Sequence, residues 1–342
     1  GTDGFNITIP FDASYSITDF NNLTIAYYDG TEWTELPSTV TGTSASGSIT
    51  TNSTVSDFSN RYFALGYKSQ RTYVPDDNFE AYLETHDASG NVVSVGDASS
   101  MGDGIANNDY VTTANISSVI NLDVQNQNIA DLTGIEGFSS INNLNCAQNQ
   151  LTSLDISQNL SLGVLSCNIN QLTNLDVTLN TALNSLNCQD NSLTFLDLTN
   201  NVSLNTLYCN NNQLTTLDLS QNSSLINLNC QDNQISSLDF SQIAGLATLQ
   251  CHSNQLTSLD ITQNTALTSV TCYTNQISNL DLTQNINLTF LRCESNQLTS
   301  LDLTNNTSLN YFYCDNNQLS SLDLSNNNGL IRLSAATNQL TS

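Results

Sequence analysis

A cysteine recurs every 21 residues along most of this chain. The nine cysteines stand at positions 146, 167, 188, 209, 230, 251, 272, 293 and 314, and a leucine column (154 to 322) and an aspartate column (155 to 323) keep the same step. A period of about 20 to 29 residues predicts a stack of short coils, because a unit of this size cannot bury its apolar face alone. We therefore expect a solenoid of about eleven coils with short parallel strands over residues 120–342.

Each repeat has the form L-x-C-x-x-N-Q-L-T-S-L-D-L-S-x-N-x-x-L-x-x. This motif resembles the leucine-rich repeats of bacterial surface proteins of the internalin type, and most closely those of exported Bacteroidota proteins. The resemblance implies an extracellular or cell-surface adhesin, exported by type IX secretion to the cell outer membrane. It does not identify a ligand, since one scaffold carries many different sites.

Residues 1–72 have no 21-residue period. Apolar and polar residues alternate around positions 5–9 and 23–27, which predicts a small antiparallel β-sandwich-like module. We expect a hairpin turn at Asp29-Gly30 and a loop over the Gly/Ser/Thr-rich residues 41–48. The last coil stops in mid-motif, so we expect the chain to be part of a larger protein or assembly, with part of this module upstream of Gly1.

Residues 73–119 are expected to form a helical N-terminal cap and a polar loop. Phe79, Tyr82, Leu83 and His86 have the i, i+3, i+4, i+7 spacing of one helical face, and Asp77 with Glu80 indicates the N-cap. Residues 74–80 also resemble the caps of the Bacteroidota proteins. Such a helix would cover the open apolar end of the solenoid. We interpret His86 as a half-buried residue of this cap.

The cysteines are expected to be free thiols in the core. Alternation along the L-x-C segment directs Leu144 and Cys146 inward and Asn145 outward. In-line parallel cysteines point alike, so they cannot all pair as disulfides, and a stack that offers one sulfur per coil cannot supply the four converging ligands of zinc.

Two asparagine columns follow the same period. In the first, which begins at Asn149, we expect the amides to bond turn backbone in their own coil and the next. The second, from Asn159, is interrupted by Ile243. This indicates that the environment on that side of the coil is less demanding, so that an asparagine is not required in every repeat.

The aspartate column raises the question of metal binding. We expect these outward carboxylates to accept N–H bonds from the turn that follows, and calcium between neighbouring coils is the alternative. Asp103, Asn107 and Asp109 partly match a calcium loop, but Ser99 and Met101 stand where earlier oxygen ligands belong. An ordinary polar loop is the main interpretation, and no cofactor is expected otherwise.

Charge excludes some classes of partner. Lys and Arg number 5 against 31 Asp and Glu, for a formal net charge of −26. Nucleic acid and anionic membrane surfaces are therefore repelled, and no apolar run is long enough to insert into a membrane. With two histidines, inward cysteines and no grouped nucleophile and base, we expect no catalysis.

The candidate binding site is the concave face, where outward strand positions change along the solenoid. Early coils carry small or amide residues such as Asn145, Ser166 and Asn187. Aromatic and charged residues, types enriched at recognition hot spots, occur later: Tyr208, His252, Tyr273, Phe290, Arg292, Glu294, Tyr311, Tyr313, Asp315 and Arg332. We expect a protein or glycan to bind there. One alternative is that the aromatics reflect only β-propensity; a second is that the solenoid is a structural spacer or scaffold segment.

Overall fold

The chain divides into two compact units, Gly1–Arg71 and Thr72–Ser342. Its structure is a computed structural model that describes residues 6–12, 23–28, 33–36, 38–43, 46–51, 62–67 and 71–341. Each unit has its own hydrophobic core, and each is treated by itself below.

The first unit contains two three-stranded antiparallel sheets. Their strand orders are β1 (Thr8–Asp12), β5 (Ser46–Thr51), β4 (Ser38–Thr43) and β3 (Trp33–Leu36), β2 (Leu23–Tyr28), β6 (Tyr62–Tyr67). Phe11 and Ile49 from one sheet pack with Leu23 and Ile25 from the other in a single core. Small antiparallel sheets at the N-terminal end are thus confirmed.

The loop expected at residues 41–48 is wrong. Strands β4 and β5 cover most of this stretch, with Val40 opposite Ile49 and Thr41 opposite Ser48. The Thr41 and Ser48 hydroxyls are 3.2 Å apart. Small β-branched and hydroxyl residues suit the exposed face of a pleated sheet, so a polar stretch still forms strands where its alternate residues are apolar. The turn expected at Asp29-Gly30 lies outside the described residues.

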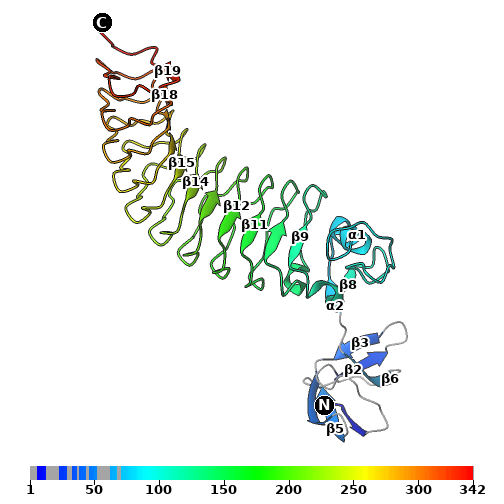
Figure 1. Cartoon of the computed structure of the whole chain (residues 1–342). Coiled ribbons are helices and arrows are strands. Elements are labelled where there is room, and N and C mark those ends of the chain that lie inside the picture. The colour runs from blue at the N-terminus through cyan, green and yellow to red at the C-terminus, as the bar shows by residue number, and fades with distance from the viewer. Residues whose placement is uncertain are drawn as a thin grey trace. The chain divides into compact units, whose positions relative to one another are not determined.

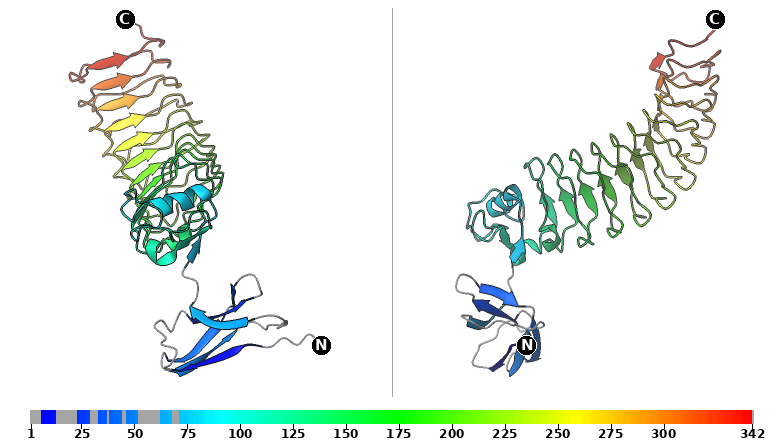
Figure 2. Two further views of the ribbon diagram at one scale, coloured as in Figure 1. Left: turned by 90° about the vertical axis from the view of Figure 1, so that its right-hand side faces the viewer. Right: turned by 180° about the vertical axis from the view of Figure 1, so that it is seen from behind.

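The second unit is a curved solenoid built on one parallel sheet of eleven strands, which confirms the expected number of coils. Figure 1 shows the arc, with the strands on its inner side, and the left view of Figure 2 shows neighbouring strands side by side. In chain order the strands are β9 (Asn121–Asp123), β10 (Asn143–Asn145), β11 (Val164–Ser166), β12 (Ser185–Asn187), β13 (Thr206–Tyr208), β14 (Asn227–Asn229), β15 (Thr248–Gln250), β16 (Ser269–Thr271), β17 (Phe290–Arg292), β18 (Tyr311–Tyr313) and β19 (Arg332–Ser334).

The cysteines are core residues, as expected, and all nine are free and buried. Strand β10 is centred on Leu144, and Cys146 follows it directly. The backbone N–H of Cys146 still donates to the carbonyl oxygen of Ser166 in the next coil, at 2.8 Å. Leu144 and Cys146 are both completely buried. Nine of the eleven coils therefore add one thiol each to the continuous core, next to a buried apolar strand residue.

The first asparagine column ties each coil to the one before it, not to the one after it as expected. The Asn170 amide nitrogen donates to the carbonyl oxygens of Cys146 and Cys167, at 3.0 and 3.1 Å. Its oxygen accepts the N–H of Leu151 at 3.0 Å. One side chain thus satisfies turn backbone groups in two coils.

The second asparagine column is more buried than the first, so the expected less demanding environment is wrong. Asn201 is completely buried, and its amide nitrogen donates to the carbonyls of Val177 and Asn180, at 3.1 and 2.9 Å. Ile243 is also fully buried in this column. The isoleucine keeps the packing and gives up the two bonds between coils.

The aspartates cap their own turns, as expected. The Asp176 carboxylate accepts the hydroxyl and the backbone N–H of Thr178, at 2.6 and 2.9 Å. These two bonds hold the pKa of the Asp176 carboxyl below its usual value. Like charges on neighbouring coils are therefore offset by hydrogen bonds inside each coil.

A cap precedes the first coil. It contains the two-stranded sheet of β7 (Arg71–Tyr73) and β8 (Tyr110–Thr112), the helix α1 (Asp77–Thr85) and the short helix α2 (Thr113–Ile116). Phe79 and Leu83 of α1 are fully buried, and the Phe79 ring lies 6.3 Å from that of Phe138 in the first coil. His86 is half-buried, as expected. The apolar end of the solenoid is thus covered.

The N-cap of α1 is Asp76 and not Asp77. One Asp76 oxygen accepts the N–H groups of Asn78 and Phe79, both at 3.0 Å. The other accepts those of Ala130 and Asp131 in the first coil, at 2.8 and 3.1 Å. A single carboxylate therefore both starts the helix and fastens it to the solenoid. In the described part of the chain, no helix is long and apolar enough to cross a membrane.

Candidate binding surface on the concave face

The predicted site residues lie in three parallel rows on the inner side of the arc. The rows are the first and third strand residues and the residue after each cysteine. Phe290 pairs with Tyr311, and Arg292 with Tyr313, in the register of β17 and β18. Side-chain alternation directs all three rows to one face, so residues of successive coils become neighbours.

Six of these residues form one connected surface, which we call the aromatic strip. The Arg292 guanidinium carbon lies 4.4 Å from the Tyr273 ring centroid and 5.5 Å from that of Tyr313. The Arg332 guanidinium carbon also lies close to the Tyr313 ring, 5.4 Å from its centroid. The Phe290 ring is 6.1 Å from each of the Tyr311 and Tyr313 rings. The strip therefore comprises Tyr273, Phe290, Arg292, Tyr311, Tyr313 and Arg332.

Glu294 holds Arg292 in place. Arg292 donates from Nε and from a terminal nitrogen to the same Glu294 oxygen, at 2.8 and 2.6 Å. This charge-assisted pair raises the pKa of the arginine further. The other Glu294 oxygen is buried and has no partner among the described residues. Glu294 was expected on the surface, but it is buried, because Arg292 bonds to its carboxylate from the outer side.

His252 is also buried, with 6% of its surface exposed, although a surface position was expected. The Tyr273 ring covers it at 4.1 Å between centroids, with the two planes 20° apart. Burial lowers the pKa of the imidazole, so His252 is neutral at physiological pH. Its Nδ1 atom has no hydrogen-bond partner in the described structure. His252 thus supports Tyr273 from below.

Two further predicted residues are not part of the strip. Tyr208 is 37% exposed on β13, four strands before β17, and therefore does not touch the strip. Asp315 lies beside the strip, but its carboxylate is bound to the last coil. It accepts the Ser334 hydroxyl at 2.8 Å and the Ala336 N–H at 2.9 Å. Asp315 thus holds the end of the sheet together.

The partial calcium loop is organised by helix α1. Glu80 of α1 accepts the N–H groups of Asn108 and Asp109, at 3.0 and 3.2 Å. The Asp109 carboxylate lies near those of Asp77 and Glu80. Asp103 instead accepts the N–H of Ile105 at 2.9 Å, and Asn107 is an exposed residue with a φ of 57°. Backbone donors occupy several of the oxygens that a cation would need.

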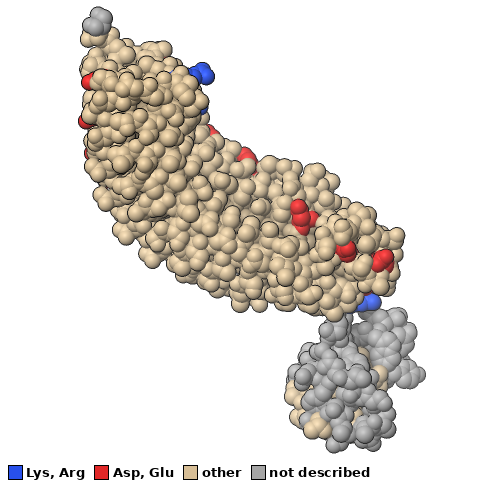
Figure 3. Space-filling model, in the orientation of Figure 1, with Lys and Arg blue, Asp and Glu red and all other residues tan. Residues whose placement is uncertain are grey.

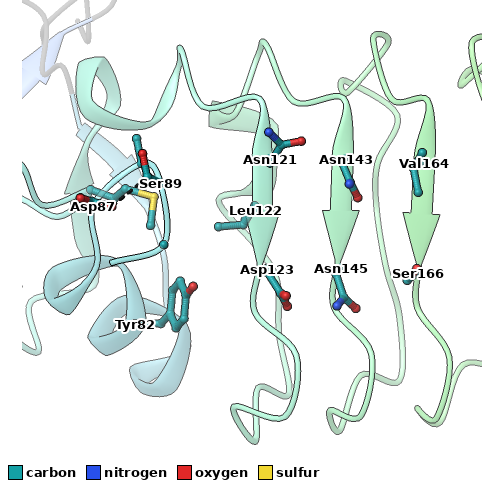
Figure 4. Close-up of a pocket in the computed structure, with 13 residues that line it drawn as sticks. Tyr82, Asp87, Ser89, Asn121, Leu122, Asp123, Asn143, Asn145, Val164 and Ser166 are labelled. Atoms are coloured by element: carbon teal, nitrogen blue, oxygen red, sulfur yellow. Dashed lines mark hydrogen bonds between the residues drawn. The ribbon is translucent and has the colours of Figure 1, made fainter. Parts of the chain in front are cut away.

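Sequence reasoning missed a cavity of about 580 Å³ between the cap and the first coils. Tyr82, Asp87 and Ser89 line it from the cap, and the strands β9 to β11 line it from the other side (Figure 4). In the sequence, the small and amide residues of the early coils do not indicate a binding site. Only the fold of the cap against them makes a pocket, and no sequence pattern signals that.

The nine cysteines behind this surface are buried. Burial raises the pKa of the Cys230 thiol to about 12, and the other eight cysteines are shifted in the same direction. A protonated, buried thiol is a poor nucleophile. The strip instead presents ring faces, two guanidinium groups and a polar edge, the groups that proteins use to bind other molecules.

No protein-family profile matches the chain. Internalin J of Listeria monocytogenes serotype 4b (strain F2365) is 40% identical over 51 residues, which are 15% of this chain and 6% of that protein. The solved functional domain of InlJ from Listeria monocytogenes, described as including a cysteine ladder, is 39% identical with a TM-score of 0.72. That match covers 80% of this chain and 58% of the solved one.

Two further structures are similar. A leucine-rich repeat protein of Leptospira interrogans is 28% identical with a TM-score of 0.62, over 66% of this chain and 62% of that one. An internalin, InlF, from Listeria monocytogenes strain 4b F2365 shares the fold at 23% identity and a TM-score of 0.52, over 79% of this chain and 92% of that one. The chain is a leucine-rich repeat solenoid with a cysteine in each regular coil. Its fold is internalin-like, with repeats of 21 residues.

Proposed function

We propose that this chain is the non-catalytic binding module of an exported or cell-surface protein and that the aromatic strip recognises a protein partner. The observation that carries the proposal is the packing of Arg292 between the Tyr273 and Tyr313 rings, next to Phe290 and Tyr311. Aromatic and arginine side chains dominate the energetics of protein interfaces. Here they gather over four adjacent strands.

Order within the strip favours tight recognition. Arg292 is fixed by Glu294 and by two rings, and Tyr273 is fixed by His252. Binding a partner therefore immobilises few side chains, and each such loss of freedom costs roughly 0.5 to 1.5 kcal/mol where it occurs. β-Propensity alone does not account for an arginine stacked on two rings from neighbouring coils.

Charge supports the same surface. The chain is strongly acidic, and Figure 3 shows basic atoms at the C-terminal end of the arc and a second basic group at its N-terminal end. Arg292 and Arg332 both belong to the strip. These two arginines make the strip locally more positive than the chain as a whole, which favours a partner with aromatic or carboxylate groups. A glycan stacked on the tyrosine rings is the second ligand class that this surface suits.

The proposal is tested by a binding screen against extracellular proteins and glycans, followed by hydrogen exchange on the complex found. We expect slower exchange in β16 to β19 and unchanged exchange in the turns that follow the aspartate column. Protection of those aspartate turns with an unprotected strip would contradict the site. A chain that binds nothing in this screen would favour the spacer role.

A further inference from the structure

The cavity between the cap and the solenoid lies at the opposite end of the parallel sheet from the aromatic strip. We call it the cap pocket. Its volume of about 580 Å³ exceeds the space that a single amino-acid side chain occupies. Figure 4 shows Asn121 and Asn143 in one row and Asp123, Asn145 and Ser166 in a second row, on the strands next to the cap. This end of the concave face is therefore hollow and polar where the other end is aromatic.

Several polar groups of the cap pocket are not used by the fold. Among the described residues, the side-chain amides of Asn121 and Asn143 and the hydroxyl of Tyr82 make no hydrogen bond, whereas asparagines elsewhere in the coils bond to backbone. The Asp123 carboxylate accepts only the Gln125 N–H, at 3.1 Å on one oxygen. One carboxylate oxygen, two amides and one hydroxyl are thus open to a ligand.

The pocket is electronegative. Burial raises the pKa of the Tyr82 hydroxyl, and the charges of Asp123 and Asp87 raise it further, which places both carboxylates within electrostatic reach of that hydroxyl. Asp87 is already engaged by the N–H groups of Ser89 and Asn91, both at 2.9 Å. No lysine or arginine is among the residues that line the pocket. Asp123 therefore has no counter-ion there.

Apolar groups complete the pocket. Leu122, Met101 and Val164 are part of its lining, and Leu122 points toward the cap in Figure 4. A lysine or arginine side chain needs this combination, because its methylene stem packs on apolar surface while its charged end requires acceptors. A sugar fits less well. The Tyr82 ring is 8% exposed and is stacked on His86 at 3.9 Å, so it offers no open face for a sugar ring.

We propose that the cap pocket binds the guanidinium or ammonium group of a basic side chain, with Asp123 as its counter-ion and the Asn121 and Asn143 oxygens as further acceptors. That this side chain belongs to the protein partner rests on the proposed function, whereas the chemistry of the pocket does not. A partner that reached both ends of the concave face would place a basic residue near β9 and its aromatic or acidic contacts near β17 and β18.

The test uses N-acetyl-arginine amide as the probe and N-acetyl-citrulline amide as its neutral match, titrated into the whole chain and followed by NMR. A ligand of this size is expected to bind with a Kd on the order of 1 mM. We expect the arginine probe to shift signals of residues around Asp123 and the citrulline probe to bind about tenfold more weakly or not at all. Raising the salt concentration should weaken the arginine probe alone.

Variants locate the site. Asp123→Asn keeps an acceptor for the Gln125 N–H and removes the charge, so the fold is retained and probe affinity should fall about tenfold or more. Asp155→Asn, in the exposed aspartate column, and Tyr313→Ala, in the strip, should leave probe binding unchanged. Equal binding of arginine and citrulline, an unaffected Asp123→Asn variant, or preference for methyl glycosides over the arginine probe would each overturn the proposal. Strip-dependent partner binding would survive those outcomes, so the two proposals fail separately.

Discussion

The guanidinium carbon of Arg292 lies 4.4 Å from the centre of the Tyr273 ring, which belongs to the preceding coil. Neighbouring coils of a solenoid are normally held together by packing of core leucines and by backbone hydrogen bonds. Here two surface side chains also link them. Cation–π contacts of this kind contribute roughly 0.5 to 2 kcal/mol. The strip therefore adds to the rigidity of the end of the solenoid on which recognition is proposed.

The Asp76 carboxylate should matter more for stability than its neighbour Asp77. Asp76→Ala removes the N-cap of α1 and the two bonds to the first coil, so we expect a loss of at least about 1 to 2 kcal/mol. Asp77→Ala removes an exposed first-turn charge and should cost less than about 0.5 kcal/mol. Urea unfolding of both variants measures the difference. Phe79→Asp, which exposes the core under α1, should cause aggregation; equal behaviour of all three variants would contradict the cap.

The thiols should make the fold sensitive to alkaline pH. Burial raises the pKa of Cys230 from 9.0 to about 12, so the folded chain keeps its proton while the unfolded chain loses it. The stabilisation is complete below pH 9 and is lost as pH rises from 9 toward 12. At pH 10 the loss is about 1.4 kcal/mol for Cys230. Urea midpoints at pH 8 and 10 measure it.

Matched cysteine variants check this explanation. Cys230→Ala should show a smaller alkaline loss than the parent chain, and Cys230→Ser should lower stability at pH 7 by about 1 to 3 kcal/mol through an unpaired buried hydroxyl. Mass spectrometry of the folded protein without reductant should find nine unpaired cysteines, slow to alkylate. A disulfide between Cys146 and Cys167 would contradict the free-thiol ladder.

The second asparagine column can be tested by placing an aliphatic residue elsewhere in it, as the chain itself does at Ile243. Asn201→Leu removes two bonds to carbonyls of earlier coils and should cost about 1 to 3 kcal/mol. Val202→Leu, at the adjacent exposed position whose side chain makes no hydrogen bond, should be nearly neutral. Thermal unfolding compares them. If Asn201→Leu is harmless, then the amide bonds contribute nothing that an aliphatic side chain cannot replace.

The aspartate column should depend on pH and not on calcium. The hydroxyl and N–H of Thr178 lower the pKa of Asp176, so this group stabilises the fold above the unfolded pKa of about 3.9 and stops doing so as pH falls through its lower folded value. Stability should therefore decline below about pH 4. Thr178→Val should raise the pKa of Asp176 in an NMR titration. A chelator should not change the melting temperature at pH 7; a clear decrease would favour calcium between coils.

Much of the solenoid follows from its period, because one coil repeated eleven times leaves few arrangements of the leucines and cysteines. The sequence does not show that the residue before each first-column asparagine has a left-handed backbone. Ile169, with a φ of 54°, is a β-branched residue in that conformation. The bonds that Asn170 makes to its own coil and to the preceding coil hold this turn. Periodicity therefore identifies the column, and only the three-dimensional contacts explain it.

The candidate site was predictable in part. Register alone placed Phe290, Arg292, Tyr311 and Tyr313 side by side, since equivalent positions of successive coils are neighbours. Burial of His252 was not predictable, because it depends on the rotamer that Tyr273 adopts over it. The cap pocket was missed for a related reason. It forms between segments whose packing has no counterpart in the repeat.

The most direct test of the proposed recognition surface is the affinity of the partner for the double variant Phe290→Ala, Tyr313→Ala. Both side chains are partly exposed, so thermal stability should stay close to that of the parent chain. Asn187→Ala, on the concave face at β12, is the matched control. We expect the double variant to bind at least about a hundredfold more weakly, as the loss of two hot-spot aromatics implies, with the control unchanged. Binding that survives the double change would contradict recognition by the aromatic strip.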